Sequence, residues 1–236
     1  MLKKEAGVCF ILLPGFSPDD FTVQNLKRCL EKRGCHAVAS NFYGNAVVKD
    51  FSKVKVADCL ENISEIIKEA KKNHDKVIGV GISLGGAFLL EHAKREKNLD
   101  AIISIGTPFR LKNVFLIKLG QKILLPVVSP FWKMAEKIKK LRLPPITATK
   151  VITDYLRKEF ILNLENITVP ILFVHSKKDR ITDFRVLEEF SNKIPSLNKK
   201  MIILDNGDHV INGGSEKICE YIFDFIEPEQ LIHPVE

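Results

Sequence analysis

One stretch of this 236-residue chain limits its fold more than any other. Residues 77–80 form a short apolar run that is typical of a buried strand, and residues 87–94 are typical of a helix. Between them stands Gly81-Ile82-Ser83-Leu84-Gly85, a tight turn with a serine at its centre. The two glycines remove side chains that would collide across such a turn. The pattern predicts a strained strand–turn–helix unit with Ser83 at its tip; the alternative is a glycine-rich turn whose serine only caps the helix.

Strand-like and helix-like segments alternate along the rest of the chain. Apolar runs predict further strands at residues 7–13, 35–40, 101–105, 171–175 and 200–204. The helical spacing of apolar residues predicts helices after residue 20, over residues 56–72, after residue 183 and from Ser215 onward. This alternation predicts an α/β fold with a doubly wound, mostly parallel sheet and helices on both of its faces.

The composition fits one domain with a sizeable core, because 45% of the residues are hydrophobic. The formal net charge is +7, but it is concentrated in one segment. Ten Lys and Arg residues and a single acid, Glu136, fall between Arg110 and Lys150, so this segment carries +9 and the rest of the chain carries −2. A local excess of this kind, without a nucleic-acid-binding motif, argues against a nucleic-acid partner.

The five cysteines show neither CxxC nor CxxH spacing, which favours reduced thiols over a disulfide framework or a zinc site. The sequence contains no dinucleotide-binding fingerprint and no P-loop. We therefore expect no metal and no cofactor. The apolar run at residues 8–13 is too short for a signal sequence, and no stretch is long enough for a membrane span, so we expect a cytoplasmic protein.

Polar and titratable residues gather just beyond the predicted strands. Ser83, Asp179 and His209 each follow an apolar run by a few residues. The carboxyl ends of parallel strands meet at one edge of a sheet, and this edge is where ligands bind in such folds. We therefore expect the three side chains to lie together.

The order of these residues resembles that of the α/β-hydrolases, especially the small carboxylesterases and monoglyceride lipases. The resemblance covers essentially the whole chain. It rests on residues 81–85, on Leu13-Pro14-Gly15-Phe16 after the first strand, and on the order Ser, Asp, His. It implies that Ser83 is a nucleophile, that His209 is its general base and that Asp179 orients the imidazole.

Three other carboxylates are rivals for the orienting role: Asp183, Asp205 and Asp208. Asp183 fits a helix cap better. The other two fit the tight turn that carries His209. Asp179 is favoured because it lies directly beyond a strand end, in the position that the family uses.

The same resemblance implies an oxyanion hole made by backbone N–H groups. The N–H of Leu84, directly after the serine, is the expected first donor, and the N–H of Phe16, on the loop after the first strand, is the expected second. Esterases of this kind usually have His-Gly before the second donor, whereas this chain has Pro14-Gly15. Having Pro-Gly in place of His-Gly leaves the backbone N–H of Phe16 available as a donor. The replacement affects the conformation of the loop.

A long segment interrupts the alternation at the point where this family inserts a lid. We expect residues 1–108 and 167–236 to form the hydrolase core and residues 109–166 to form a helical cap. The apolar residues of the cap predict an acyl pocket lined by Phe109, Phe115, Trp132 and Ile138. The alternative is a cap that packs on the core and keeps its lysines in solvent. Under the first interpretation, the basic rim allows peripheral contact with anionic lipid.

These residues predict a serine esterase or lipase that acts on a small-molecule ester through an acyl-enzyme. The expected substrate is a short- to medium-chain carboxylic ester or a monoglyceride. An acyltransferase or thioesterase would use the same three residues. A non-catalytic binding protein on a hydrolase fold is the third interpretation, and the intact set of three residues argues against it. The acyl length, the alcohol and the oligomeric state do not follow from the sequence.

Overall fold

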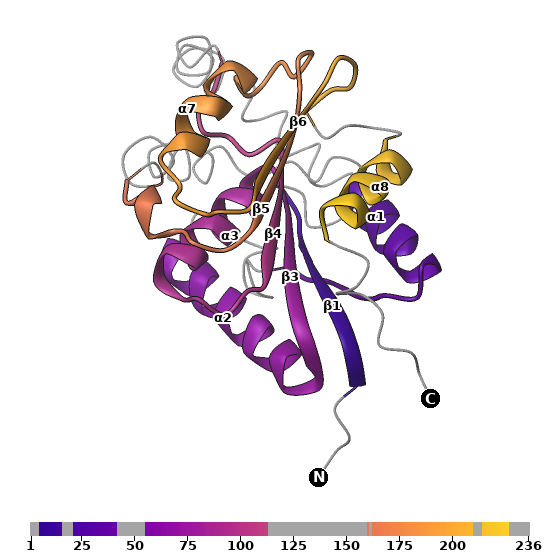
Figure 1. The fold of residues 1–236 in the computed structure, drawn as a ribbon. Helices are drawn as coiled ribbons and strands as arrows, with labels where there is room; N and C mark the ends of the chain where they lie inside the picture. The colour runs from indigo at the N-terminus through magenta and orange to yellow at the C-terminus, as the bar shows by residue number, and fades with distance from the viewer. Residues whose placement is uncertain are drawn as a thin grey trace, which may run out of the picture.

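The computed structural model describes residues 5–15, 21–41, 55–112, 160, 162–209 and 214–226. Within them, parallel strands form one sheet in the order β2-β1-β3-β4-β5-β6 (Figure 1). The strands are β1 (Glu5–Leu13), β2 (His36–Ala39), β3 (His74–Ile82), β4 (Ala101–Ile105), β5 (Ile171–Ser176) and β6 (Lys199–Leu204). The predicted parallel sheet is confirmed.

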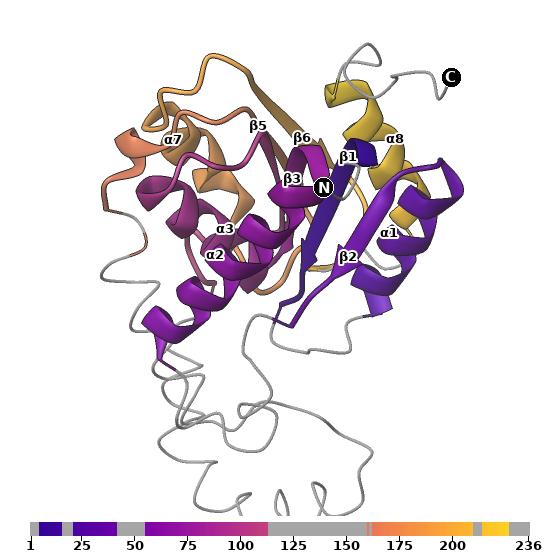
Figure 2. The same ribbon diagram turned by 90° about the horizontal axis from the view of Figure 1, so that it is seen from below.

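Helices cover both faces of this sheet, as the doubly wound prediction requires. The described helices are α1 (Phe21–Lys32), α2 (Val56–Asn73), α3 (Leu84–Arg95), α7 (Leu187–Asn192) and α8 (Ser215–Phe225), with the short 3-10 helices η3 (Leu164–Asn166) and η4 (Phe184–Val186). In Figure 1, α2, α3 and α7 lie on one side of the strands, and α1 and α8 lie on the other. Figure 2 shows the same two layers from below. None of these described helices combines the length and the hydropathy that a membrane span needs.

Two apolar clusters hold the layers together, one on each face of the sheet. β1 contributes to both, because successive side chains of a strand point to opposite faces. Cys9, Ile11 and Leu13 join the cluster under α2 and α3, whereas Phe10 and Leu12 join the cluster under α1 and α8. All five side chains are fully shielded from solvent. The continuous apolar run therefore correctly predicts a strand that is buried on both faces.

α1 ends at Lys32, and Gly34 terminates it, as the sequence predicts. The φ of Gly34 is 79°, in the left-handed region where other residues are strained. The N–H of Gly34 donates to the carbonyl of Glu31 (3.0 Å), and the N–H of Cys35 donates to the carbonyl of Leu30 (3.2 Å). This is a Schellman motif, which satisfies the last carbonyls of the helix. The chain then enters β2, which pairs in parallel with β1.

Two elements begin three residues earlier than predicted. β3 begins at His74, three residues before the predicted strand, because His74 pairs with Glu5 of β1. α3 begins at Leu84, three residues before the predicted helix, so the helix follows Ser83 at once. Both differences lengthen an element, since pairing and helix nucleation at the turn extend the structure past the apolar pattern.

Most of the expected cap, residues 109–166, lies outside the described residues. Of this range the structure describes residues 109–112, 160 and 162–166. The rings of Phe109 and Phe160 lie 5.5 Å apart, and both belong to the apolar cluster under α2 and α3. Phe109 and Phe160 thus join the core, and the helical cap itself stays a prediction.

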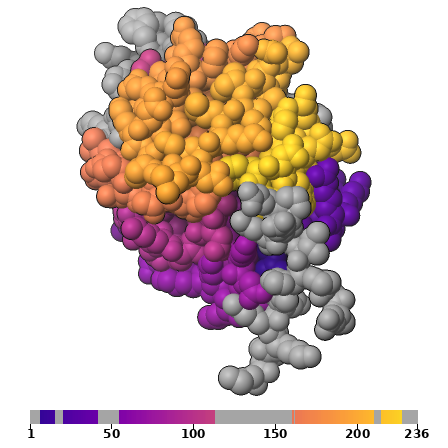
Figure 3. All heavy atoms as spheres, in the orientation of Figure 1, coloured from indigo at the N-terminus to yellow at the C-terminus, as the bar shows by residue number. Residues whose placement is uncertain are grey.

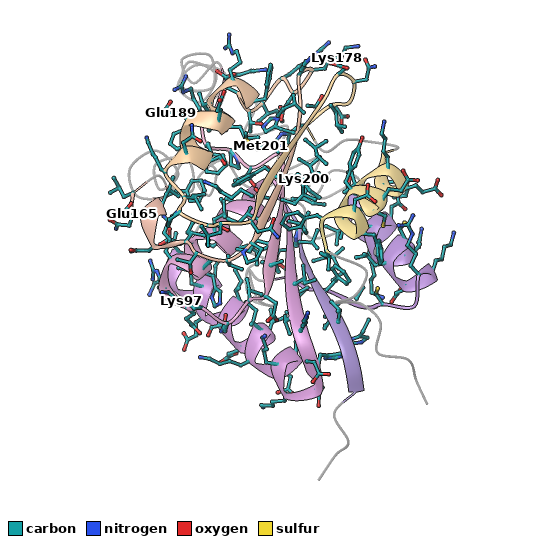
Figure 4. The ribbon with its side chains drawn as sticks, viewed as in Figure 1. Lys97, Glu165, Lys178, Glu189, Lys200 and Met201 are labelled. Carbon is teal, nitrogen blue, oxygen red and sulfur yellow. The ribbon has the colours of Figure 1, made fainter. Side chains whose placement is uncertain are left out.

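β6 is an edge strand of the described sheet. Figure 4 labels Lys200 and Met201 on it, and Met201 keeps 42% of its surface exposed. Charged side chains on an edge strand oppose pairing with another chain. In the space-filling view, the orange residues around this edge form much of the visible surface (Figure 3).

Candidate active site

Ser83 occupies a strained turn between β3 and α3. Its φ of 51° and ψ of −114° lie outside the regions that residues other than glycine favour. The N–H of Ser83 donates to the carbonyl of Ile105 in β4 (2.7 Å), and the N–H of Gly86 donates to the carbonyl of Ser83 (3.0 Å). These backbone hydrogen bonds hold the serine at the carboxyl edge of the sheet, as the strand–turn–helix pattern predicts.

The glycines of the turn are required by close backbone approach. A Cβ on Gly81 would lie 2.4 Å from the backbone nitrogen of Gly86, and a Cβ on Gly85 would lie 2.3 Å from the carbonyl oxygen of Leu13. A Cβ on Gly15, just after β1, would lie 3.4 Å from the Cβ of Ser83. The segment that follows β1 therefore begins directly beside the serine.

His209 joins Ser83 to Asp179 through its two ring nitrogens. Nε2 lies 2.7 Å from Ser83 Oγ, and Nδ1 lies 2.8 Å from Asp179 Oδ2. An ionised carboxylate only accepts hydrogen bonds, so Nδ1 carries the proton and Nε2 accepts from the serine hydroxyl. Ser83 and Asp179 are buried, and the His209 side chain keeps 14% of its surface exposed. The structure thus brings together the three side chains that the sequence singled out.

The Asp179 carboxylate is held by four donors. Oδ1 accepts from the backbone N–H groups of Ile181 (2.7 Å) and Thr182 (2.9 Å), and Oδ2 accepts from Thr182 Oγ1 (2.5 Å) as well as from His209. Burial alone would raise the pKa of this carboxyl, but the hydrogen bonds from His209 and Thr182 outweigh burial and hold the pKa well below its ordinary value. Asp179 is therefore ionised at neutral pH.

Thr182 and His175 extend the chain of hydrogen bonds behind Asp179. The backbone N–H of Ser176 donates to His175 Nδ1 (2.9 Å), so the proton of the neutral ring is on Nε2. That Nε2 donates to Thr182 Oγ1 (2.9 Å), which in turn donates to Asp179. Burial lowers the pKa of His175 and keeps its ring neutral. The sequence analysis gave neither residue a part in the site. The short spacing between Asp179 and Thr182 was the one sequence feature that could have indicated Thr182.

Of the two expected oxyanion donors, the structure describes Leu84 but not Phe16. Leu84 is the first residue of α3, so its backbone N–H has no acceptor within the helix. A helix N-terminus of this kind favours an anion. Phe16, the expected second donor, lies outside the described residues.

The expected acyl pocket is described only at Phe109. The other three residues, Phe115, Trp132 and Ile138, lie outside the described residues. Phe109 is buried, and its ring packs against Phe173 (5.9 Å) and Phe190 (5.1 Å) as well as Phe160. These contacts are those of a core residue, and a part for Phe109 in substrate binding stays a prediction.

His209 Nδ1 donates its hydrogen bond to Asp179 and not to the rivals whose partners are described. Asp183 accepts from the N–H of Arg185 (3.2 Å) and pairs with its guanidinium (2.8 Å), so it caps η4. Asp205 pairs with Lys177 at the surface (2.6 Å). The contact of Asp183 agrees with the helix cap expected for it, and the turn-shaping part expected of Asp205 stays a prediction.

The buried neutral histidines predict an acid-sensitive fold. Burial lowers the pKa of His92 and of His175 below the ordinary value of 6.5. Below about pH 6.5 the unfolded chain therefore binds more protons than the folded chain, and stability is lost as the pH falls, by up to about 1.4 kcal/mol per pH unit for each ring. The carboxyl of Asp179 contributes its own loss only below its ordinary pKa of 3.8.

Urea unfolding at a series of pH values from neutral to mildly acidic measures this dependence. His92→Gln should make the free energy of unfolding less steep in pH, because one of the two rings no longer takes up a proton on unfolding. An unchanged slope in this variant would show that His92 does not contribute.

Comparison with known proteins finds similar folds but no similar sequence. No protein-family model matches the chain, and no curated protein matches it. A structure reported for LipS and LipT, two metagenome-derived lipolytic enzymes, aligns with a TM-score of 0.75 over 95% of each chain at 17% identity. A bromoperoxidase from Bacillus anthracis aligns with a TM-score of 0.70 over 93% of this chain and 92% of its own, at 15% identity. A monoacylglycerol lipase from Paleococcus ferrophilus gives 0.66 over 92% and 93%, at 14% identity.

Structural similarity at sequence identities this low shows a shared fold but not a shared activity. In this chain the parallel sheet lies between two helical layers, and the serine turn, Asp179 and His209 lie at its carboxyl edge. Another of the similar structures is a putative hydrolase of the alpha/beta superfamily from Xanthomonas campestris. The chain has the α/β-hydrolase fold.

Proposed function

We propose that this chain is a serine hydrolase that cleaves carboxylic esters through an acyl-enzyme on Ser83. The proposal rests on the hydrogen bonds from Ser83 Oγ to His209 Nε2 (2.7 Å) and from His209 Nδ1 to Asp179 (2.8 Å). A serine hydroxyl is a weak nucleophile until a base within hydrogen-bond reach takes its proton. The names of several similar structures, which are lipolytic enzymes and esterases, support the same reaction class.

Each of the three groups has one part in the proposed reaction. His209 Nε2 takes the hydroxyl proton as Ser83 Oγ attacks the ester carbonyl carbon, and the carbonyl electron pair moves to oxygen. When the tetrahedral intermediate collapses, the bond to the alcohol breaks and Nε2 gives its proton to the leaving oxygen. Water then repeats both steps on the acyl-enzyme and releases the acid. The Asp179 carboxylate stabilises the imidazolium and fixes its tautomer.

The negative oxygen of the intermediate needs donors that are already in place. We assign the first to the N–H of Leu84, at the start of α3, where the helix dipole also favours negative charge. The N–H of Phe16 is the proposed second donor. Its neighbour Gly15 lies beside Ser83, which supports that assignment.

The proposed substrates are esters with short to medium acyl chains, or monoglycerides. The apolar residues of segment 109–166 and the similarity to a structure named as a monoacylglycerol lipase support this class. The basic rim of that segment is proposed to meet anionic lipid. The cytoplasmic location and the absence of a nucleic-acid partner stay predictions.

Hydrolysis of p-nitrophenyl esters from acetate to palmitate tests the proposal. We expect turnover that is highest for short or medium chains, and we expect a fluorophosphonate probe to label the native chain but not Ser83→Ala. A competing alcohol or thiol separates hydrolysis from acyl transfer, because a transferase forms a new ester or thioester in place of the free acid. A chain that neither hydrolyses an ester nor takes up the probe would be a binding protein on this fold.

Thr182 should position Asp179 through its hydroxyl. Thr182→Val keeps the shape of the side chain but removes the hydrogen bonds to Asp179 and from His175. A hydrogen bond to a charged group contributes about 1.5–3 kcal/mol, so kcat/KM for the best ester should fall about 10- to 100-fold. Thr182→Ser keeps the hydroxyl and should retain most of the activity. If the serine variant loses as much as the valine variant, Thr182 acts by packing alone.

A further inference from the structure

Three side chains of types that can bind a metal ion lie together on the sheet, away from the carboxyl edge that carries Ser83. They are Cys9, His36 and His74, whose sulfur and ring nitrogen atoms all lie within 4.8 Å of one another. Strand register brings them together: Cys9 of β1 pairs with His36, the first residue of β2, and His74 is the first residue of β3. Figure 2 shows β1, β2 and β3 from below. None of the three side chains has a part in the proposed ester hydrolysis.

The tautomer of His74 suits it to a metal. Its Nδ1 lies 3.1 Å from the carbonyl oxygen of Ala70, in the last turn of α2. A carbonyl only accepts, so Nδ1 carries the proton and Nε2 presents its lone pair. Metal-binding histidines commonly donate their other N–H to a backbone carbonyl, which fixes the orientation of the ring. The His74 ring is buried, so the fold holds this ligand atom in place.

His36 connects the cluster to solvent. Its side chain is exposed, whereas Cys9 and His74 are buried. The two imidazole rings stack with their centroids 4.7 Å apart and their planes at 9°. Because the lone pair of an imidazole lies in the plane of its ring, two stacked rings cannot both point at one ion. Binding therefore requires the His36 ring to rotate out of the stack, and an exposed side chain changes rotamer at low cost.

We propose that Cys9, His36 and His74 bind one Zn²⁺ ion, with a fourth position open to water. Thiolate and imidazole are ligands that Zn²⁺ prefers, and three protein ligands with an open position are a known zinc arrangement. Burial raises the pKa of the Cys9 thiol to about 11, so the metal-free cluster holds a neutral thiol. The thiol gives its proton to solvent when the Zn–S bond forms. The ion joins three strands and acts on stability rather than on ester turnover.

The expectation of no metal rested on the spacing of cysteines and histidines within short segments. The ligands of this cluster are far apart in the chain and come from three different strands. The pairing of Cys9 with His36 and the start of β3 at His74 are what place them together. Local spacing does not encode either of these features.

Titration of the metal-free protein with Zn²⁺ tests the proposal. Calorimetry should give one site per chain, and Tm should rise with excess ion because the ion binds the folded state preferentially. Co²⁺, as a spectroscopic probe, should add a thiolate-to-metal charge-transfer band in the near ultraviolet. His36→Ala should weaken binding about tenfold or more while leaving the fold intact, because the side chain is exposed.

Three further variants separate this site from others in the molecule. Cys9→Ala should remove the cobalt thiolate band. Cys59→Ala removes another buried thiol, and His209→Ala removes the imidazole of the candidate active site, and both should bind Zn²⁺ with unchanged affinity. Lack of a stoichiometric site, equal affinity in His36→Ala, or a cobalt spectrum without the thiolate band would each overturn the proposal.

Discussion

Replacing Ser83 by alanine is expected to lower ester turnover about a million-fold, the loss that follows when the serine of such a triad is removed. Alanine has no oxygen to attack the ester, although His209 stays paired with Asp179 (2.8 Å). The fold should be unchanged, because the turn is held by backbone hydrogen bonds to Ile105 and from Gly86, which do not involve the hydroxyl.

Steady-state hydrolysis of the best p-nitrophenyl ester measures this loss, and circular dichroism with urea unfolding checks the fold. Ser64→Ala is a matched control, since Ser64 is also a buried serine but lies on α2 and donates to Glu96 (2.7 Å). The control should keep wild-type turnover. Comparable turnover in Ser83→Ala and wild type would mean that another group is the nucleophile.

Much of the sheet could be predicted because each strand is an apolar run between residues that end it. β4 matches the predicted strand at both ends, and β5 and β6 each differ from the prediction by one residue. α8 begins at Ser215, as predicted, and buries Ile218, Ile222 and Phe225. Patterns over a few residues decide these elements, because burial on a strand or helix face has a short period.

The contacts among Ser83, Asp179 and His209 could be predicted for a related reason. Parallel strands place their carboxyl ends at one edge, so the rule needs only the order of elements along the chain. The parts of Thr182 and His175 could not be predicted in this way. They depend on which ring nitrogen of His175 carries the proton, and the contacts of that ring with Ser176 and Thr182 in the folded chain decide it.

The cluster of Cys9, His36 and His74 could not be predicted from the sequence either, since it depends on the register between strands. The register of β1 with β3 shifts between Glu5 and Val8, and no feature of the sequence predicts the size of that shift. Hydrophobic periodicity shows which face of a strand is buried, but not which residues of neighbouring strands lie side by side.

Asp179→Asn is expected to lower kcat about 10,000-fold while the three side chains stay in place, as in other serine triads. The amide oxygen of the new residue would keep the Oδ1 position, because the N–H groups of Ile181 and Thr182 both donate there. The NH₂ group must then face His209 Nδ1. Two donors cannot share a hydrogen bond, so Nδ1 gives up its proton and accepts, and Nε2 becomes protonated. A protonated Nε2 cannot take the proton of Ser83, and the serine is no longer activated.

Kinetics of the matched variants Asp183→Asn and Asp205→Asn decide whether this argument applies to Asp179 alone. Asp183 pairs with Arg185 and Asp205 pairs with Lys177, so neither amide would change the tautomer of His209. Both controls should keep kcat within about threefold of wild type, since each carboxylate pairs with a basic side chain that is exposed and ion pairs of that kind contribute little. The ¹⁵N chemical shifts of the His209 ring report its tautomer directly. In Asp179→Asn the shift of a protonated nitrogen should be found at Nε2 and no longer at Nδ1. A large loss in either control, or an unchanged tautomer in Asp179→Asn, would assign the orienting role to a different carboxylate.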